Sequence, residues 1–226
     1  MSQNSFFGHA QAQHMQGGAG ELAFIINQLT SKMQTVTLVK VVKVHGIGVN
    51  PVGNVDVQPL VAQLDGSGGI MPHGIIHNIP YFRLQGGKNA VIIDPEIGDI
   101  GLCAFASRDI SQVKQKRAAA APKSRRRFDF ADGLYLGGFL NGAPEQYVLL
   151  NNAGIKLFSP KKIEIEAINI NINGKTTING SLSQTGGGAA TFSGSLKATG
   201  NLESDRDVVA SGKSFLNHTN GGMGLD

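Results

Sequence analysis

The apolar positions follow a helical spacing near the start of the chain and a strand-like spacing after it. Between residues 21 and 35, apolar side chains recur every three or four positions; these are Leu22, Ile25, Ile26, Leu29 and Met33. We expect an amphipathic helix of about three turns here. From Val36 onward, short β-branched runs are separated by Gly, Pro, Asn and Asp. This pattern predicts a small antiparallel barrel or sandwich over residues 36–110.

A third pattern begins near residue 160 and is typical of fibrous β-structure. Isoleucines alternate with Glu and Asn, and a shift of one residue after Ile165 predicts a bulge or corner. Residues 178–186 (INGSLSQTG) and 192–200 (FSGSLKATG) match each other at an offset of 14. A short repeat with glycine at its corners and one apolar residue per strand indicates a β-solenoid or a fibre.

This third segment is too poor in large apolar residues to fold as one isolated copy. Fixing the backbone costs about 1–2 kcal/mol per residue, whereas burying an aliphatic side chain contributes about 1.5–3 kcal/mol. Three intertwined copies would bring each apolar residue to its two symmetry mates and pair every strand edge. We expect nine residues to form this trimer core: Ile163, Ile165, Ile168, Ile170, Ile172, Ile178, Leu182, Phe192 and Leu196.

Positive charge is concentrated in one segment, although charged residues make up only 16% of the chain. From Lys114 to Arg127 there are seven positive charges and no negative one. We expect an exposed connection with a short Ala-rich helical piece that ends at Pro122. A basic run on a small barrel can bind nucleic acid, but this run has no aromatic residues between its charges. A solvated loop is the simpler interpretation, and neutralising Arg125, Arg126 and Arg127 would test the alternative.

The sequence contains no catalytic signature, so we expect the protein not to be an enzyme. The GKT at 174–176 and the GKS at 212–214 lack the earlier glycine that a phosphate-binding loop requires. His73 and His77 are four residues apart, but the flanking Pro and Gly argue against a helix joining them as metal ligands, and we expect loop or surface histidines. The single cysteine, Cys103, lies in an apolar run and is expected to be buried.

The N-terminal residues 1–20 carry no charge and are rich in Gly, Gln and Ala. We expect an arm that is flexible or is ordered by a partner. The arm has no basic region followed by an apolar one, so we expect no signal peptide. No run approaches the about 18 apolar residues of a membrane-spanning helix. We therefore expect the chain to be made and kept in a cytoplasm until something else moves it.

The block from residue 97 to residue 141 gives the sequence a family resemblance. The matching residues are Gly98, Asp99, Gly101, Arg108, Asp109, Arg125, Arg126, Asp129, Asp132, Gly133, Gly137 and Gly138. A barrel pattern precedes this block and an isoleucine-rich, glycine-cornered segment follows it. In this order of parts, most of residues 20–226 resembles the central baseplate spike, or membrane-piercing tail-tip, proteins of contractile-tailed bacteriophages.

The resemblance implies an all-β homotrimer with a tapered tip. The expected parts are an N-terminal arm and helix (1–35), an OB-fold-like barrel (36–110), a basic connection and neck (111–145), an intertwined triple-stranded β-helix (146–213) and an apex (214–226). The barrel would dock on the baseplate hub protein of the phage. Sheath contraction would push the needle through the host outer membrane. The chain would then be a virion protein of the tail baseplate, assembled in the host cytoplasm, with no nucleic acid as a partner.

In many members of that family the tip carries a His-x-His pair, so that three chains hold a buried iron ion. The matching triplet here is His218-Thr219-Asn220, with the poorer ligand Asn in second place. The resemblance implies iron or another metal ion held at the trimer axis by three His218 side chains. Alternatively, His218 and Asn220 only satisfy hydrogen bonds in a trimeric cap whose core Phe215 and Leu216 close.

Two other functions stay open at this point. One is a tail-fibre or adhesin-like stalk that binds a surface glycan through its tip. The other is a barrel that binds nucleic acid through the basic run. A spike and a stalk both require a trimer, whereas binding of glycan or of single-stranded nucleic acid would separate the three.

Overall fold

A computed structural model describes residues 17–51, 53–65, 67–211 and 213–214. The chain is mostly β, and it divides between Ile163 and Glu164 into two compact units. Over the described residues, no helix is both long enough and apolar enough to cross a membrane.

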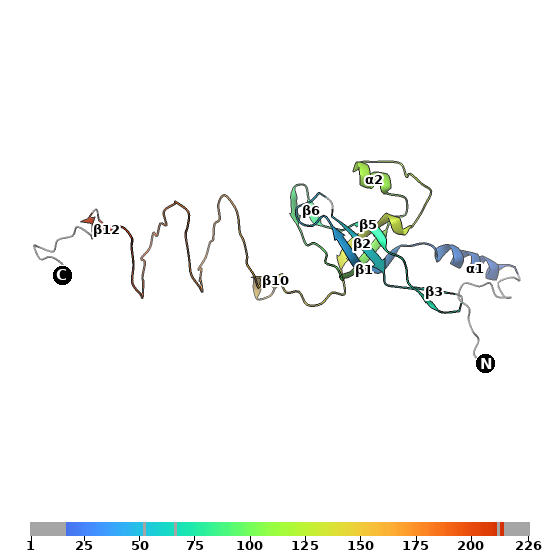
Figure 1. Cartoon of the computed structure of the whole chain (residues 1–226), viewed down its shortest axis with the longest axis horizontal. Coiled ribbons are helices and arrows are strands. Elements are labelled where there is room, and N and C mark those ends of the chain that lie inside the picture. Colours follow the sequence, from blue (N-terminus) through green and yellow to red (C-terminus); the bar gives the residue numbers. More distant parts are fainter. Residues whose placement is uncertain (1–16, 52, 66, 212, 215–226) are drawn as a thin grey trace, which may run out of the picture. The chain divides into compact units, whose positions relative to one another are not determined.

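The first unit is built on a curled antiparallel sheet that forms half a barrel (Figure 1). In pairing order, its strands are β5 (Ile76–Pro80), β2 (Asn54–Pro59), β1 (Val36–His45), β8 (Ile100–Phe105) and β9 (Gly133–Gly138). Register shifts in the β1–β2, β2–β5 and β8–β9 pairs are the irregularities that bend strands. The edge strands meet at a parallel bridge between Tyr81 and Tyr135. There the Phe82 N–H donates to the Tyr135 carbonyl at 2.7 Å.

Alternation along these strands places one set of side chains inside the curl. The buried apolar residues are Val39, Val41, Val55, Val57, Ile79, Tyr81, Cys103, Phe105 and Tyr135. Valines dominate because β-branched side chains pack well on a pleated surface. The predicted burial of Cys103 is confirmed, since its exposed fraction is 0%. Burial raises the pKa of this thiol to about 12, so it is protonated and unreactive at neutral pH.

Short hairpins complete the strands of the first unit. β3 (Gln63–Leu64) pairs with β4 (Ile70–Met71), and β6 (Leu84–Gly86) pairs with β7 (Asn89–Val91). After the half-barrel, β10 (Tyr147–Asn151) pairs with β11 (Gly154–Phe158).

The first helix lies where the apolar spacing predicted one, and the second does not. α1 spans Ala19–Thr30 and has no buried residue. α2 spans Ser111–Lys116, and the alanines before Pro122 are not helical. The prediction of an Ala-rich helical piece was therefore wrong. Arg117 adopts a left-handed conformation that ends α2, and a proline disfavours helix in the residue before it. A 3₁₀ helix, η2 (Phe130–Asp132), leads into β9.

The second unit is extended over most of its described length. Residues 164–208 form neither helix nor strand and run in extended lengths joined by bends (Figure 1). The short strands β12 (Val209–Ala210) and β13 (Lys213–Ser214) follow as a hairpin.

Candidate functional site

The extended segment 164–208 bends at nearly regular intervals. Most of its bends are about six residues apart, and glycines stand at many of them: Gly174, Gly180, Gly186, Gly194 and Gly200. The offset of 14 residues in the sequence corresponds to one step of six and one of eight between these glycines. Each length between bends is therefore that of an ordinary β-strand, although no strand pairs with it among the residues that the structure describes.

Large apolar residues stand two positions from these glycines. They are Ile172, Ile178, Leu182, Phe192, Leu196 and Leu202. Alternate residues of an extended chain share one face, so the four glycines with such neighbours, which are all but Gly186, lie on the same side as the apolar residues. A glycine on the apolar side lets another backbone approach closely at the bend.

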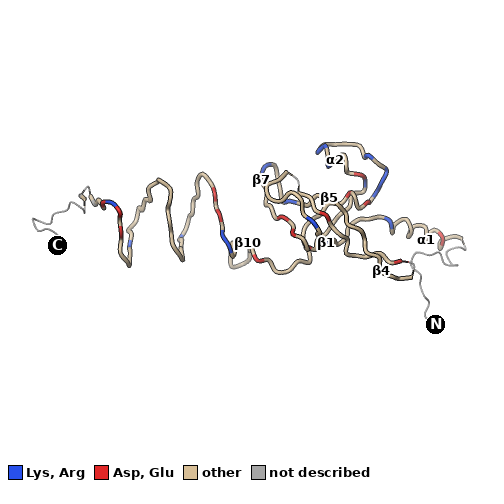
Figure 2. The backbone as a smooth tube through the Cα atoms, viewed as in Figure 1, with Lys and Arg blue, Asp and Glu red and all other residues tan. Residues whose placement is uncertain are grey.

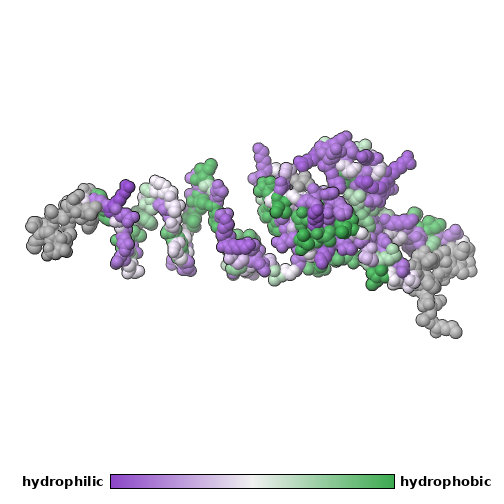
Figure 3. All heavy atoms as spheres, in the orientation of Figure 1, coloured by the Kyte–Doolittle hydropathy of each residue, from purple (hydrophilic) through white to green (hydrophobic). Residues whose placement is uncertain are grey.

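All nine residues predicted to form a trimer core are exposed in the single chain. Their exposed fractions range from 53% for Ile163 to 100% for Ile168. Hydrophobic atoms accordingly lie at the surface of the second unit (Figure 3). Within one copy, the structure spaces these residues along the backbone and does not bring them together. Such a surface is typical of an interface.

The hairpin β10–β11 also leaves most of its apolar side chains exposed. Tyr147 stacks on Phe158 with a centroid distance of 5.3 Å, and Lys156 Nζ lies over both rings. Most of its other apolar side chains are exposed, namely Val148, Leu149, Leu150, Ile155 and Leu157. An isolated two-stranded hairpin is marginally stable in water, so this hairpin too is suited to packing against another surface.

The basic connection is tied to the half-barrel by an ion-pair cluster. The Arg126 guanidinium donates from Nε to Asp132 at 2.6 Å and from Nη2 to Asp109 at 2.8 Å. Both carboxylates are buried, with side-chain exposures of 0% and 1%. Asp132 also accepts from the Ile110 N–H, and Asp109 accepts from the Ser111 N–H and the Ser124 hydroxyl.

These contacts set the charge state of the cluster. Hydrogen bonds from Ser111 and Ser124 and the charge of Arg126 hold the pKa of Asp109 well below its ordinary value. Burial would raise the pKa of Asp132, but hydrogen bonds from Arg126 and Ile110 hold it below its ordinary value. Arg126 is therefore the counter-ion of two buried carboxylates.

This arrangement changes the interpretation of the basic run. Lys and Arg gather on α2 and on the connection after it (Figure 2). Arg126 is engaged, and Lys114 donates to the Ala131 carbonyl at 3.2 Å. Arg125 and Arg127, on either side of Arg126, are exposed. Neutralising all three arginines would therefore disturb the fold as well as the surface charge.

The two histidines singled out in the sequence make different contacts. His73 packs edge-on against Phe130 at 5.1 Å, whereas His77 Nδ1 lies 3.0 Å from Asp56. His45 was not singled out in the sequence. Its Nε2 lies 3.2 Å from the other carboxylate oxygen of Asp56. Burial would raise the pKa of Asp56, but hydrogen bonds from the Asn78 N–H and His77, together with the nearby His45 imidazole, lower it to about 2.

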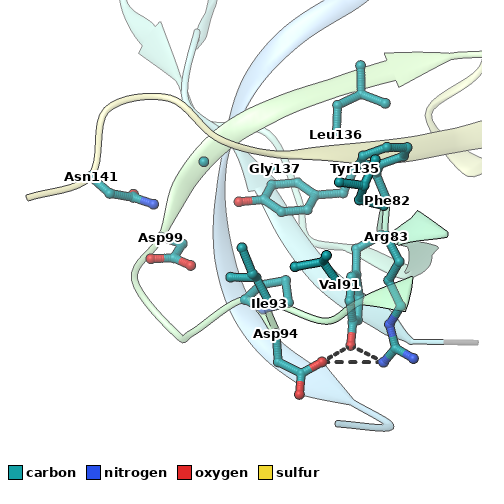
Figure 4. A pocket seen from close by; sticks show the side chains of 14 residues that line it. Phe82, Arg83, Val91, Ile93, Asp94, Asp99, Tyr135, Leu136, Gly137 and Asn141 are labelled. Carbon is teal, nitrogen blue, oxygen red and sulfur yellow. Dashed lines mark hydrogen bonds and ion pairs between the residues drawn. The ribbon is translucent and has the colours of Figure 1, made fainter. Parts of the chain in front are cut away.

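A cavity of about 290 Å³ opens beside the bridge between the edge strands (Figure 4). On one side, the Tyr81 hydroxyl donates to Asp94 at 2.5 Å and accepts from Arg83 at 2.6 Å. Asp94 also accepts from the Gly48 N–H at 2.6 Å. The network thus ties the loop before β2 to the loop before β8. Nothing in the sequence pattern pointed to it, because Asp94 meets Gly48 and the Tyr81 hydroxyl only when the loops that carry them come together in the fold.

The opposite wall of this cavity carries Tyr135. Its side chain is 1% exposed, and its hydroxyl has no hydrogen-bond partner among the described residues. Burial and the nearby charge of Asp99 raise its pKa to about 12, so the phenol is neutral at ordinary pH. Exposed apolar side chains line the rim, namely Phe82, Leu84, Val91, Ile93 and Leu136.

Apart from Ser214, which ends β13, the predicted apex (214–226) lies outside the described residues. This applies to the metal ligand His218 and to Phe215, Leu216 and Asn220. Elsewhere, the part of the chain that the structure covers has no group of three or more His, Cys, Asp or Glu arranged to hold a metal ion. The GKT at 174–176 lies in the extended segment, without the strand-to-helix turn of a phosphate-binding loop.

Comparison with known proteins adds no relative. No protein-family model matches the chain, and no curated protein is significantly similar to it.

Proposed function

We propose that the protein is the homotrimeric central spike of a contractile bacteriophage tail, and that its C-terminal part is a triple-stranded β-helix. The observation that carries this proposal is the segment 164–208, which is extended and regularly bent and forms no β-strand with any of the other described residues. Its apolar residues alternate with polar ones or flank the bend glycines, and they are exposed. A regular apolar pattern that forms no core among the described residues of one chain supports burial against other chains.

Three interleaved copies would bury the apolar residues and pair the strand edges of one another. A bend about every six residues divides the segment into lengths of about 20 Å, and three such lengths make one turn of a triangular coil. Strands stack about 4.8 Å apart, so two further copies fit between successive turns of the first and pair its edges. The apolar side of each length then faces the threefold axis, while Asn, Ser, Thr and Lys face outward.

The first unit has features that support an OB-type barrel. The strands β1, β2 and β5 pair consecutively, β8 returns to pair with β1, and β9 pairs with β8. The parallel bridge from Tyr81 to Tyr135 brings β5 to β9. That order is the one expected of a five-stranded, partly open barrel. In the proposed spike, this barrel docks on the hub protein of the baseplate.

The phage assignment rests on the block 97–141, and its residues have identifiable structural tasks. Asp109, Arg126 and Asp132 form the buried ion-pair cluster. Asp129 caps the 3₁₀ helix by accepting from the Ala131 N–H at 2.8 Å. Gly98 adopts a φ of 103°, a conformation that other residues rarely take. The residues of the block therefore stabilise the half-barrel and the chain that continues from it into the proposed β-helix.

At the tip, we propose a metal ion held by three His218 side chains, with iron as the first candidate. Imidazole nitrogens converging on an axis are good ligands for such ions. Spike action itself is mechanical: the sheath would drive the needle through the host outer membrane, and no catalytic step is needed.

Limited trypsin digestion tests the β-helix within the full chain. Lys175, Lys197 and Arg206 are exposed in one copy, yet strand pairing between copies would protect the backbone beside them. We expect rapid cleavage at Arg125 or Arg127 in the basic connection, which serve as internal controls, and slow cleavage in 164–208. Equal cleavage rates in both regions would overturn the β-helix.

Immunogold labelling tests the position in the particle. Antibodies raised against the half-barrel should label the distal end of the tube in contractile tails that contain this chain. Label on lateral fibres would instead support the glycan-binding stalk.

A further inference from the structure

The helix α1 presents an apolar stripe that the described residues of its own chain leave exposed. Four of its large side chains are between 46% and 62% exposed: Leu22, Ile25, Ile26 and Leu29. A helix of 12 residues is marginal in water without packing on its apolar face. The stripe is therefore suited to another surface that runs along the helix.

The spacing of the apolar residues on α1 indicates that the partner surface is another helix. Ala19, Leu22, Ile26 and Leu29 are separated by steps of three, four and three residues. These are the a, d, a and d positions of a heptad, in which a helix packs along another helix by knobs into holes. Ala23 and Ile25 flank them and widen the apolar face, which suits more than one neighbouring helix.

The charges on α1 suit identical neighbours. From Gly17 to Thr35 the only charged residues are Glu21 and Lys32, and neither occupies an a or d position. Parallel identical helices bring each core position against itself, so a charge there would repel its own copies. The combination of Ile at a and Leu at d by itself favours two-stranded coils, so a three-helix coil requires that the trimer be set by the rest of the molecule.

The rest of the chain holds α1 close to the half-barrel. Just after the helix, the Gln34 N–H donates to the Phe128 carbonyl at 3.1 Å, and the Thr35 carbonyl accepts from the Phe105 N–H at 2.8 Å. A trimer built by the β-helix would thus carry three tethered copies of α1. Tethering gives even a short coiled coil a high effective concentration.

We propose that the three α1 helices of one trimer pack together as a short parallel coiled coil, with Leu22, Ile26 and Leu29 in its core. This inference rests on the proposed trimer. It adds a second interface, formed by the N-terminal part of the chain, to the one proposed for the β-helix. In this arrangement α1, whose apolar side chains the described part of its own chain leaves exposed, holds the copies together.

Engineered cysteines test the arrangement in the full chain. Leu22→Cys and Leu29→Cys place thiols at d positions, where facing copies come within reach of a disulfide. Asn27→Cys is the matched control, because it lies in the same helix on the polar side. The native Cys103 is buried and its thiol pKa is raised to about 12, so it adds little background.

After mild copper–phenanthroline oxidation, we expect a disulfide-linked dimer on non-reducing gels for both d-position variants. Its formation should be about tenfold faster than for Asn27→Cys. A trimer by sedimentation in which neither variant outpaces Asn27→Cys would overturn the coiled coil and leave the spike proposal standing. A monomer by sedimentation would overturn both. The two variants guard against a local defect at one position.

Discussion

Arg126 is the residue on which the basic connection depends. Replacing it by Ala would leave Asp132 and Asp109 buried without their counter-ion, and breaking such a pair is strongly destabilising. We expect Arg126→Ala to lower the melting temperature of the half-barrel by roughly 10 °C. Arg125→Ala, beside it and exposed, should leave it unchanged. Circular dichroism melts of the two variants, compared with the parent chain, would expose a failure of this account if both shifted alike.

Removing the hydroxyl groups of the two buried tyrosines that line the cavity, Tyr81 and Tyr135, should change the free energy of unfolding differently. Tyr81 bonds both Asp94 and Arg83, so Tyr81→Phe should cost about 1–3 kcal/mol. Tyr135 has no partner for its hydroxyl among the described residues, so Tyr135→Phe should be neutral or stabilising. Urea unfolding followed by circular dichroism measures both. A large loss for Tyr135→Phe would mean that its hydroxyl is bonded after all.

The pKa of Asp56 predicts an acid limit for the half-barrel. Its folded value of about 2 lies below the about 3.9 of an unfolded aspartate. A depressed pKa adds stability above the unfolded value, and that stability is lost as the pH falls from about 4 toward 2. Asp56→Asn should flatten the melting temperature over this range, whereas Asp205→Asn, in the second unit, should not. Parallel pH curves for Asp56→Asn and the parent chain would rule out this role.

At the scale of elements, the close contact of β8 with β9 depends on Gly101 in β8, which has no side chain. A Cβ on Gly101 would come within 2.2 Å of the Gly137 carbonyl and 2.3 Å of the Tyr135 hydroxyl. We expect Gly101→Ala to destabilise the half-barrel by about 1–3 kcal/mol. Gly142→Ala is the control, because nothing lies within 4 Å of its Cβ. Urea midpoints that fall equally in the two variants would contradict this packing.

Elements that depend on local spacing could be predicted, and those that depend on distant contacts could not. The apolar spacing that starts at Leu22 predicted α1, and β-branched runs predicted the strands of the half-barrel. Alanine has the highest helix propensity, but this preference is weak, and α2 ends at the left-handed Arg117 before the alanines begin. The Arg126 cluster could not be predicted from local spacing, because Asp109 lies 17 residues before Arg126 and the two meet only in the folded chain.

At the scale of the whole molecule, a pattern in one chain can indicate copies of itself. The isoleucine alternation and the 14-residue repeat indicated a shared core, and the extended, uncovered segment 164–208 is consistent with that prediction. The six-residue spacing of the bends was harder to predict from the sequence. At 186–188, three consecutive glycines leave the position of one bend ambiguous. Neither pattern alone distinguishes a spike from a fibre stalk, since both need the same trimer.

Sedimentation equilibrium of the full chain tests this central claim most directly. The account predicts a single species with three times the 23.7 kDa mass of one chain, unchanged on dilution through the micromolar range. A monomer of 23.7 kDa would contradict the trimer, the β-helix and the spike together.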